Sequence, residues 1–554
     1  MRIAKHFVSV GQRRVHYFRA GKGPALVLLH ASACSAKVLR PLIEAFAGDF
    51  TVIALDTPGF GLSDKLSTAA PRIEDFADAL AETLDALGIR HVAVQGRHTG
   101  ASIAAEFAAR HPERCAMALT DGYPLLAGDY DEARIAQYLK PIEPAWDGSH
   151  LVWLWFRYRD QHAFWPWNAQ RLRNRADTDI PDLDFLHRGV IEFLEAGNDY
   201  RLGYAAPFRH DAAGLFQRLR VPVCFGTRPG DWLHHMTHLY PPGTWHEVMP
   251  REGDDAAERE RTILKRNPAT GTVPPPPACA ALPGRPTTDY ASIDGTSLLL
   301  RAAGQDRPGE PVLLLPALPG SSALYDELLM ALAAYRPVFS LDLPGHGESD
   351  PLPGNPQDVE TWARAALAVL DRLGLARVQL YGHQGGASVA VELALRQPAR
   401  FGAPALEAPI VLEAPLATEF ARHFAPDLAP CWEGAHLLRA WHHVRDQELW
   451  WPWYRRQRGN ARTHEPRIEP AALTARVREI LKQPASFQPA WRALIDYPLA
   501  ERMRRLAVPP LLVCAAEDAF APAFAAARAA RPDAAAVTLP DTSAARARLL
   551  SDRR

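Results

Sequence analysis

Apolar and polar positions in the first half of the chain predict a hairpin followed by strands that alternate with helices. Two short alternating segments, Phe7–Val10 and Val15–Phe18, flank a glycine-containing turn, which is the pattern of a β-hairpin. Ala25–Leu29 is an uninterrupted apolar run, as expected for a central strand buried on both faces. Apolar positions from Ile73 to Leu87 follow helical spacing, and another strand is predicted at Val92–Val94. Strands alternating with helices indicate a parallel sheet covered on both faces.

The pattern changes between about 124 and 220, where helices rich in aromatic residues are predicted. The sheet resumes at Val221–Phe225, and the last strand of this half is predicted at Trp245–Met249. The second half shows the same order of elements. Its predicted strands include Val312–Leu315, Val338–Leu341 and Pro510–Cys514.

The two halves are related by a constant offset of 286 residues. Asp56–Gly61 matches Asp342–Gly347, and the segment Gly96-Arg97-His98-Thr99-Gly100 matches Gly382-His383-Gln384-Gly385-Gly386. Further on, Arg159-Asp160-Gln161 and Trp165-Pro166-Trp167 match Arg445-Asp446-Gln447 and Trp451-Pro452-Trp453. The constant offset indicates that two domains of one fold are joined head to tail.

The glycine-flanked segments around His98 and Gln384 carry a family resemblance. Each follows an apolar strand and precedes a helix of small residues, which resembles the Gly-x-Ser-x-Gly nucleophile elbow of the α/β-hydrolase superfamily. The glycines are present in both halves, but His98 and Gln384 stand where that family has its serine. The resemblance implies the α/β fold class, with two tandem α/β-hydrolase domains. Each would be a mostly parallel, doubly wound sheet with a helical cap.

Domain boundaries follow from this comparison of the halves. We expect the first domain at 1–268 with a cap at about 124–220, and the second at 289–554 with a cap at about 414–505. The intervening segment 269–288 is rich in proline, as in an extended, semi-rigid linker. With 554 residues, the chain is also too long for a single hydrophobic core.

In the superfamily the nucleophile is followed along the chain by an acid and then a histidine. The resemblance places the acid at Asp231 in the first half and at Asp518 in the second. A second acid position falls on Asp121 and Glu407. Neither half has a histidine after its last predicted strand, and the late histidines of the first half are expected on a helix or within a strand: His234, His235, His238 and His246. A Ser-His-Asp mechanism is therefore excluded for the second half and not expected for the first.

His98 offers a different chemistry, because an imidazole can act as a general base or as a nucleophile. We expect its ring to face the pocket near the backbone N–H groups of Ala31 and Thr99, the oxyanion donors that the resemblance implies. A catalytic imidazole needs an orienting carboxylate, so a hydrogen bond to Asp231 or Asp121 is predicted.

Two further positions distinguish the halves. Gln384 can only donate and accept hydrogen bonds, so it is neither a nucleophile nor a base. His30 is expected in the substrate pocket of the first half, and its counterpart in the second half is Pro316.

The predicted cap of the first half contains candidate pocket residues. These are Trp153, Arg159, Trp165 and Trp167. Tryptophans favour flat apolar or aromatic ligands, and an arginine would suit a carboxylate-bearing substrate. The alternatives are that the aromatic residues form the core of the cap and that Arg159 and Asp160 form a structural ion pair.

Composition narrows the classes of partner. A net charge of −1 gives no case for binding nucleic acid or an anionic membrane. The six cysteines are scattered without metal-ligand spacing, and no dinucleotide or phosphate-loop motif is present, so neither a metal nor a cofactor is expected. No apolar run approaches the roughly 20 residues of a membrane span. The N-terminal residues lack the features of a signal peptide, so a cytoplasmic location is expected.

These observations favour an enzyme that acts at His98 on a small-molecule substrate. The expected reaction is hydrolysis, or cofactor-free C–C or C–O cleavage, of a small apolar or aromatic compound, with the second half stabilising the first. One alternative is a catalytically inactive pseudo-hydrolase that binds a ligand or a protein. Another is an esterase that uses a serine outside the elbow, such as Ser32. The sequence leaves open whether the chain forms a homo-oligomer.

Overall fold

The computed structural model describes residues 2–126, 131–228, 230–250, 256–354, 356–540 and 542–551. They form two compact units. Unit 1 contains the residues up to Glu143 together with Trp153–Ala280, and unit 2 contains Pro144–Val152 together with the residues from Ala281 onwards. Within the described residues, no helix has the length and apolar character needed to cross a membrane.

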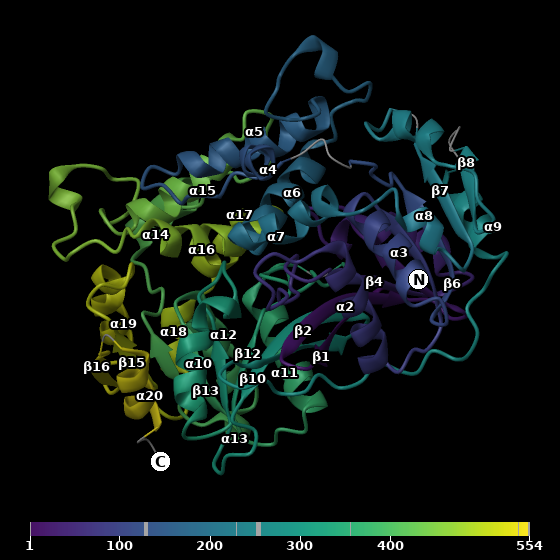
Figure 1. Cartoon of the computed structure of the whole chain (residues 1–554). Coiled ribbons are helices and arrows are strands. Elements are labelled where there is room, and N and C mark those ends of the chain that lie inside the picture. The colour runs from purple at the N-terminus through teal and green to yellow at the C-terminus, as the bar shows by residue number, and fades with distance from the viewer. Residues whose placement is uncertain are drawn as a thin grey trace. The chain divides into compact units, whose positions relative to one another are not determined.

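Each unit is built on one mixed sheet (Figure 1). In the described residues each sheet has eight strands in the same spatial order. In unit 1 the order is β1-β2-β4-β3-β5-β6-β7-β8, and in unit 2 it is β9-β10-β12-β11-β13-β14-β15-β16. The strands of unit 1 are β1 (Ala4–Val10), β2 (Arg13–Ala20), β3 (Ala25–Leu29), β4 (Thr51–Leu55), β5 (Val92–Arg97), β6 (Cys115–Asp121), β7 (Val223–Thr227) and β8 (His246–Pro250). Those of unit 2 are β9 (Thr287–Ile293), β10 (Thr296–Ala303), β11 (Val312–Leu315), β12 (Val338–Leu341), β13 (Gln379–His383), β14 (Ala405–Glu407), β15 (Leu511–Cys514) and β16 (Ala535–Thr538).

The first hairpin of each unit is antiparallel, and it joins the rest of the sheet through a second antiparallel pair, β2 with β4 in unit 1 and β10 with β12 in unit 2. Among themselves, the strands from β3 and from β11 onwards pair in parallel. Strand β3 shows why its sequence is a continuous apolar run. Val27 and Leu29 belong to a core on one face of the sheet, whereas Leu26 and Leu28 belong to a core on the other. Successive side chains of a strand point to opposite faces, so a strand covered on both sides must be apolar throughout.

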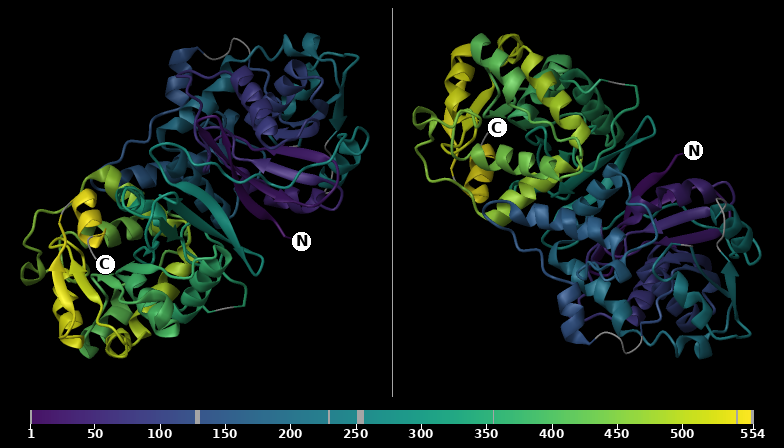
Figure 2. Two further views of the ribbon diagram at one scale, coloured as in Figure 1. Left: turned by 90° about the horizontal axis from the view of Figure 1, so that it is seen from below. Right: turned by 90° about the horizontal axis from the view of Figure 1, so that it is seen from above.

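Helices cover both faces of each sheet (Figures 1 and 2). In unit 1, α2 and α3 pack on one face, while α1 and α9 contribute to the core on the other. The helices that begin in the first half are α1 (Arg40–Phe46), α2 (Ile73–Ala86), α3 (Thr99–Arg110), α4 (Glu132–Tyr138), α5 (Ser149–Ala163), α6 (Leu183–Ala196), α7 (Tyr200–Ala205), α8 (Leu215–Arg218) and α9 (Ala256–Leu264). Those of the second half are α10 (Asp326–Ala333), α11 (Val359–Arg372), α12 (Gly385–Arg396), α13 (Pro398–Phe401), α14 (Ala414–His423), α15 (Ala435–Asp446), α16 (Pro470–Leu481), α17 (Pro484–Asp496), α18 (Leu499–Arg504), α19 (Phe524–Ala530) and α20 (Ser543–Ser551).

Short 3-10 helices complete the connections. They are η1 (Ala36–Leu39), η2 (Leu172–Asn174), η3 (Gly197–Asp199), η4 (Ala206–Arg209), η5 (His234–Leu239), η6 (Ser322–Tyr325), η7 (Arg458–Asn460) and η8 (Ala521–Ala523). Helices α4 to α8 lie between β6 and β7 in the sequence, and α14 to α18 lie between β14 and β15. These are the two aromatic-rich insertions, and we refer to each as the cap segment of its half.

The repeated Asp-x-Pro-Gly segment holds the loop that follows β3. Asp56 is buried, and its carboxylate accepts hydrogen bonds from the backbone N–H groups of Ala36 (2.7 Å) and Leu62 (2.9 Å). Asp342 accepts corresponding bonds from Ser322 (2.6 Å) and Glu348 (3.0 Å). The shared motif therefore fixes the loop beside each elbow.

Candidate active site

Both elbows adopt the sharp strand-to-helix turn that the glycine pattern predicts. His98 lies between β5 and α3 with φ 50° and ψ −110°, and Gln384 lies between β13 and α12 with φ 48° and ψ −112°. Positive φ is costly for a residue with a side chain and persists only where the surroundings enforce it. A Cβ on Gly96 would lie 2.0 Å from the carbonyl oxygen of Gly100, so the turn requires glycine there. The backbone thus presents each apex side chain at the carboxyl edge of the sheet.

His98 is held by Asp231, as predicted. Its Nε2 lies 2.7 Å from Oδ2 of Asp231, which follows β7, and the carboxylate also accepts a hydrogen bond from the backbone N–H of Leu233 (2.9 Å). Burial favours a raised pKa for Asp231, but His98 and Arg97 outweigh it and hold this pKa well below its ordinary value. The ionised carboxylate accepts a hydrogen bond from Nε2–H of His98, and Nδ1 is the ring nitrogen that makes no bond to Asp231.

The other ring nitrogen of His98 is open. Within the described part of the chain, Nδ1 has no hydrogen-bond partner, and 36% of the His98 side chain is exposed. The ring packs against Gly122, where an added Cβ would lie 2.8 Å from Cδ2 of His98. An imidazole oriented through one nitrogen and open at the other has the arrangement of a general base.

Arginines surround the two predicted acids. Arg97 lies 3.8 Å from the carboxylates of both Asp121 and Asp231, and Arg228 lies 3.3 Å from that of Asp121. Asp121 lies opposite Arg97, the residue before His98, on the neighbouring strand. Its carboxylate is in contact with both arginines. The structure shows Asp231 as the orienting partner of His98.

The expected oxyanion residues flank the apex. Thr99 is the first residue of α3, so its backbone N–H has no partner within the helix. Ala31 follows β3, and its carbonyl oxygen accepts hydrogen bonds from Nδ1 of His30 (2.9 Å) and from the backbone N–H of Cys34 (2.9 Å).

His30, expected in the pocket, is instead almost fully buried. Its Nε2 accepts a hydrogen bond from the backbone N–H of Thr57 (3.0 Å), and its Nδ1 donates one to the carbonyl oxygen of Ala31. Burial lowers the pKa of His30, so the ring is neutral. Because both nitrogens are occupied inside the protein, the ring anchors the loop that carries Ala31.

The cap tryptophans contact one another and neighbouring aromatic rings. Trp167 is buried and donates from Nε1 to the carbonyl oxygen of Tyr138 (3.0 Å), and Trp153 packs edge-on against it. Trp165 stacks on Phe208. These contacts agree with the alternative in which the aromatic residues form the core of the cap.

Arg159 also follows the structural alternative. Its guanidinium pairs with Asp160 (3.3 Å) and lies over the ring of Phe156. The matching Arg445 and Asp446 of the other cap segment form the same pair at 3.4 Å. The recurrence of this motif is thus explained by an ion pair within each cap.

The late histidines of the first half are engaged with backbone. Nδ1 of His234 donates a hydrogen bond to the carbonyl oxygen of Thr227 (3.1 Å), and Nδ1 of His235 donates one to that of Trp232 (2.5 Å). His246 packs on Phe225 within β8 and contacts the carbonyl oxygen of Pro241. None of these three imidazoles hydrogen-bonds to Asp231 in the described residues, so His98 takes that place.

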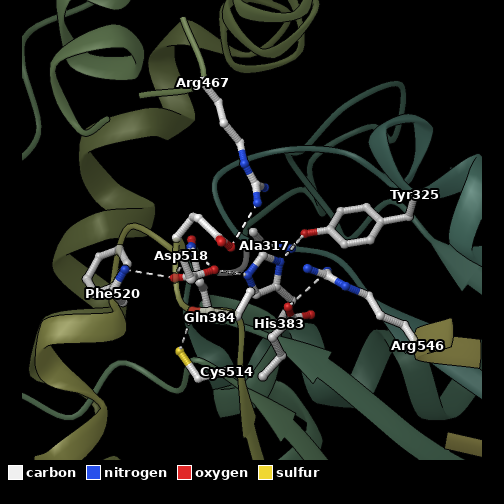
Figure 3. A network of polar contacts seen from close by, with 12 residues as sticks. Ala317, Tyr325, His383, Gln384, Arg467, Cys514, Asp518, Phe520 and Arg546 are labelled. Atoms are coloured by element: carbon white, nitrogen blue, oxygen red, sulfur yellow. Dashed lines mark hydrogen bonds and ion pairs between the residues drawn. The ribbon is translucent and has the colours of Figure 1, made fainter. Parts of the chain in front are cut away.

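Unit 2 has a closed polar network at the corresponding place, shown in Figure 3. His383 lies between Asp518, at 2.7 Å from Nε2, and the hydroxyl of Tyr325, at 2.6 Å from Nδ1. Gln384 donates from Nε2 to Asp518 (3.1 Å). The backbone N–H of Ala317, which matches Ala31, donates to the Tyr325 hydroxyl (2.9 Å). The oxyanion donor of this unit is therefore already occupied by a side chain.

Glu407 completes this network. It is buried and accepts hydrogen bonds from the Tyr381 hydroxyl and from Arg546 (3.2 Å). Burial alone would lower the pKa of His383, but Glu407, Tyr325 and Asp518 raise it well above its ordinary value. His383 is thus an imidazolium at the position of Arg97, and in both units a cation sits between the two acids.

The cluster His383, Glu407 and Asp518 also has the composition of a metal site, with one potential ligand atom from each residue within 4.8 Å of the others. The protonated imidazole places one positive charge between the two carboxylates, and Arg546 supplies a second one to Glu407. A metal ion would have to displace the proton of the imidazole, so the donor set fits an internal ion pair better than a metal centre.

Sequence reasoning missed two features of unit 1, Arg157 and His162. Both lie on α5, and Arg157 occupies the same stripe as the buried Leu154 and Tyr158. A charged residue in the apolar stripe of a helix is the signal that could have found it.

Two family models match the chain. One described as the alpha/beta hydrolase fold matches residues 24–141, and one described as the alpha/beta hydrolase family matches residues 312–546. The chain belongs to the α/β-hydrolase superfamily. It contains that fold twice in tandem, which confirms the predicted fold class.

Several similar proteins are named as hydrolases. The chain is 33% identical over 111 residues to (E)-2-((N-methylformamido)methylene)succinate hydrolase of Acinetobacter baylyi, covering 20% of this chain and 42% of that protein. It is 40% identical over 106 residues to 2-hydroxy-6-oxononadienedioate/2-hydroxy-6-oxononatrienedioate hydrolase of Burkholderia vietnamiensis, covering 18% and 37%. The chain thus spans less than half the length of these relatives. Among solved structures, that of E-2-(acetamidomethylene)succinate hydrolase is 19% identical with a TM-score of 0.36, covering 48% of this chain and 98% of that one.

Proposed function

We propose that unit 1 is a hydrolase, or a cofactor-free C–C or C–O bond-cleaving enzyme, that uses His98 in place of the elbow serine. Its substrate is a small apolar or aromatic molecule. The observation that carries the proposal is the His98–Asp231 pair, in which Nε2 is bound and Nδ1 is open. The names of the similar proteins support hydrolysis as the reaction class.

The residues at the elbow allow a reaction without a covalent intermediate. Nδ1 of His98 takes a proton from water as the water oxygen bonds to a substrate carbonyl carbon. The backbone N–H groups of Thr99 and Ala31 would stabilise the resulting oxyanion. Nδ1–H then gives the proton to the leaving group as the bond from that group to the carbon breaks. Asp231 stays ionised and balances the charge of the imidazolium.

In this proposal unit 2 is largely structural. Its apex glutamine is bonded to Asp518, and the N–H of Ala317 is bonded to Tyr325. A substrate would have to break this network before it could bind there. The same observation favours the alternative, a pseudo-hydrolase that binds a ligand or a protein, if unit 1 proves to be inactive as well.

Matched truncations at the two elbows test the proposal. We expect His98→Ala to lower turnover by on the order of 10²-fold or more, since the general base is lost. Gln384→Ala should leave turnover nearly unchanged. Turnover is measured on substrates found by screening small aromatic esters and diketones, with the fold of each variant checked by circular dichroism.

The outcomes separate the alternatives. Loss of turnover in Gln384→Ala with retention in His98→Ala would assign the active site to unit 2. Equal activity of both variants would place the chemistry outside the elbows. No turnover of any compound in the screen would favour the pseudo-hydrolase.

A further inference from the structure

A buried arginine lies inside the cap segment of unit 1. Arg157 is on α5, and only 1% of it is exposed. Its guanidinium carbon lies 4.5 Å from the ring centre of Trp167, and 5.4–6.0 Å from those of Tyr138, Phe193 and Tyr204. The charge is therefore enclosed by aromatic rings.

The polar contacts of Arg157 leave two of its three guanidinium nitrogens without a hydrogen bond in the described residues. Nη1 donates to Oε1 of Gln161 (2.7 Å), which is a neutral partner. Nε and Nη2 are buried and have no hydrogen-bond partner in the described residues, where no carboxylate pairs with this guanidinium either. The rings offset part of the cost of burying the charge through cation–π attraction. A buried charge without a counter-ion is otherwise strongly unfavourable.

The unused edge has the geometry of a carboxylate receptor. Two other arginines of this unit use the same two nitrogens to hold a carboxylate side-on. Nε and Nη2 of Arg110 bind Asp78 at 3.0 and 2.7 Å, and those of Arg209 bind Glu132 at 2.7 and 2.8 Å. Parallel N–H donors of this kind match the two oxygens of a carboxylate.

The duplication provides an internal comparison. The residue that matches Arg157 in the second cap segment is His443, which is also buried among aromatic rings, including that of Trp453. Burial lowers the pKa of His443 to about 3, so this ring is neutral. The aromatic cap therefore folds around an uncharged residue, and its packing does not require a cation at this position.

Arg157 shares its helix, α5, with a second unusual side chain, His162. His162, one turn further along α5, is half-buried, and its pKa is lowered to about 4, first by burial and then by the charges of Arg97, Arg157 and His98. The charges of Arg157 and His98 therefore both act on the imidazole of His162.

We infer that Arg157 binds a carboxylate of the small molecule on which unit 1 acts. This inference rests on the proposed function in one respect, namely that the molecule reaches His98. The carboxylate would occupy the Nε/Nη2 edge and supply the missing counter-ion. Because both nitrogens are covered by protein here, side chains of the cap must shift as the carboxylate enters.

Binding, measured without turnover, tests the inference. Titrations of the full chain would compare 3-phenylpropanoate with the neutral 3-phenylpropanamide, benzoate with benzamide, and phenyl phosphate as a different anion. The readout is tryptophan fluorescence, since Trp167 lies against the guanidinium. We expect the wild-type protein to bind at least one carboxylate about tenfold or more tightly than its amide.

Arg157→His places in unit 1 the residue that unit 2 contains, and it should abolish this preference without weakening amide binding. The exposed Arg173 gives the matched control, because Arg173→Gln should keep the preference. His98→Ala should keep it too, which separates this inference from the catalytic proposal. The inference is overturned if wild type shows no carboxylate preference at millimolar concentration, if it prefers phenyl phosphate, or if folded Arg157→His retains the preference. Should Arg157→His not fold, the wild-type titrations decide.

Discussion

Two buried glutamates, one in each cap segment, show how the surroundings of a single residue set its protonation state. Glu192 on α6 and Glu479 on α16 each accept a hydrogen bond from a serine, Ser35 and Ser321 respectively. Burial raises the pKa of Glu192 to about 8, whereas neighbouring Lys482 and Arg478 overcome burial and lower that of Glu479 to about 2. Glu192 is therefore protonated at neutral pH, and Glu479 is ionised.

The opposite pKa shifts of Glu192 and Glu479 predict opposite effects on stability when each is replaced by glutamine. The stability that protonated Glu192 contributes is complete below its unfolded pKa of 4.5 and is lost as the pH rises to about 8, at roughly 1.4 kcal/mol per unit of pKa difference. Glu192→Gln should thus raise the thermal midpoint above pH 8 and have much less effect near pH 4.5. Glu479→Gln should lower it at neutral pH, since that carboxylate stabilises the fold above about pH 4.5. Thermal unfolding of both variants at several pH values checks this, and a destabilised Glu192→Gln at pH 9 would show that Glu192 has an unseen cationic partner.

At the scale of elements, the elbow depends on the close approach of α3 to β3. A Cβ on Gly100 would lie 2.4 Å from the carbonyl oxygen of Leu29, and one on Gly386 would lie 2.4 Å from that of Leu315. Backbone atoms cannot move aside as a flexible side chain can. The glycines therefore set the distance between helix and sheet, and with it the position of His98.

Gly100→Ala should accordingly destabilise unit 1 by about 1–3 kcal/mol or more, as overpacking of a tight contact does. It should also lower activity by displacing His98. Gly48 gives the control, because a Cβ there would meet nothing within 4 Å. Chemical denaturation measures both variants, and equal stability of Gly100→Ala and Gly48→Ala would refute the argument from close approach.

At the scale of the whole molecule, one fold occurs twice with different polar interiors. Unit 1 keeps an open imidazole at its elbow, whereas the polar groups at the elbow of unit 2 are bonded to one another. The serine alternative finds no support in these contacts. Ser32 is buried, and its Oγ has no hydrogen-bond partner among the described residues, so no base activates it.

We therefore expect that fluorophosphonate probes will not label the chain. The variant His98→Ser should also stay unlabelled, because it restores the hydroxyl but removes the imidazole that would activate it. Mass spectrometry of the treated protein, with a serine esterase as positive control, checks both. An adduct on a serine of wild type would revive the esterase interpretation, and one on His98→Ser would reveal a second base at the elbow.

The fold could be predicted largely from sequence, and so could the central contact of the candidate site. The apolar runs at Ala25–Leu29 and Val312–Leu315 gave the buried strands, and the spaced glycines gave both elbows. These signals are local, because strand burial and turn strain act on neighbouring residues. The hydrogen bond between His98 and Asp231 was predictable only because the family order of acid and elbow was known.

Other parts of the site were decided by tertiary structure. The sequence assigned no role to His383 or Arg157, and it placed His30 in the pocket. His383 becomes a cation because β14 and the turn after β15 bring Glu407 and Asp518 to it. The ring of His30 is buried and accepts a hydrogen bond from the backbone N–H of Thr57. The chain alone determined two copies of an α/β-hydrolase domain without elbow serines. Which polar groups are paired and which stay open depends on residues more than a hundred positions apart in the sequence, such as His98 and Asp231, and only the folded sheet brings those together.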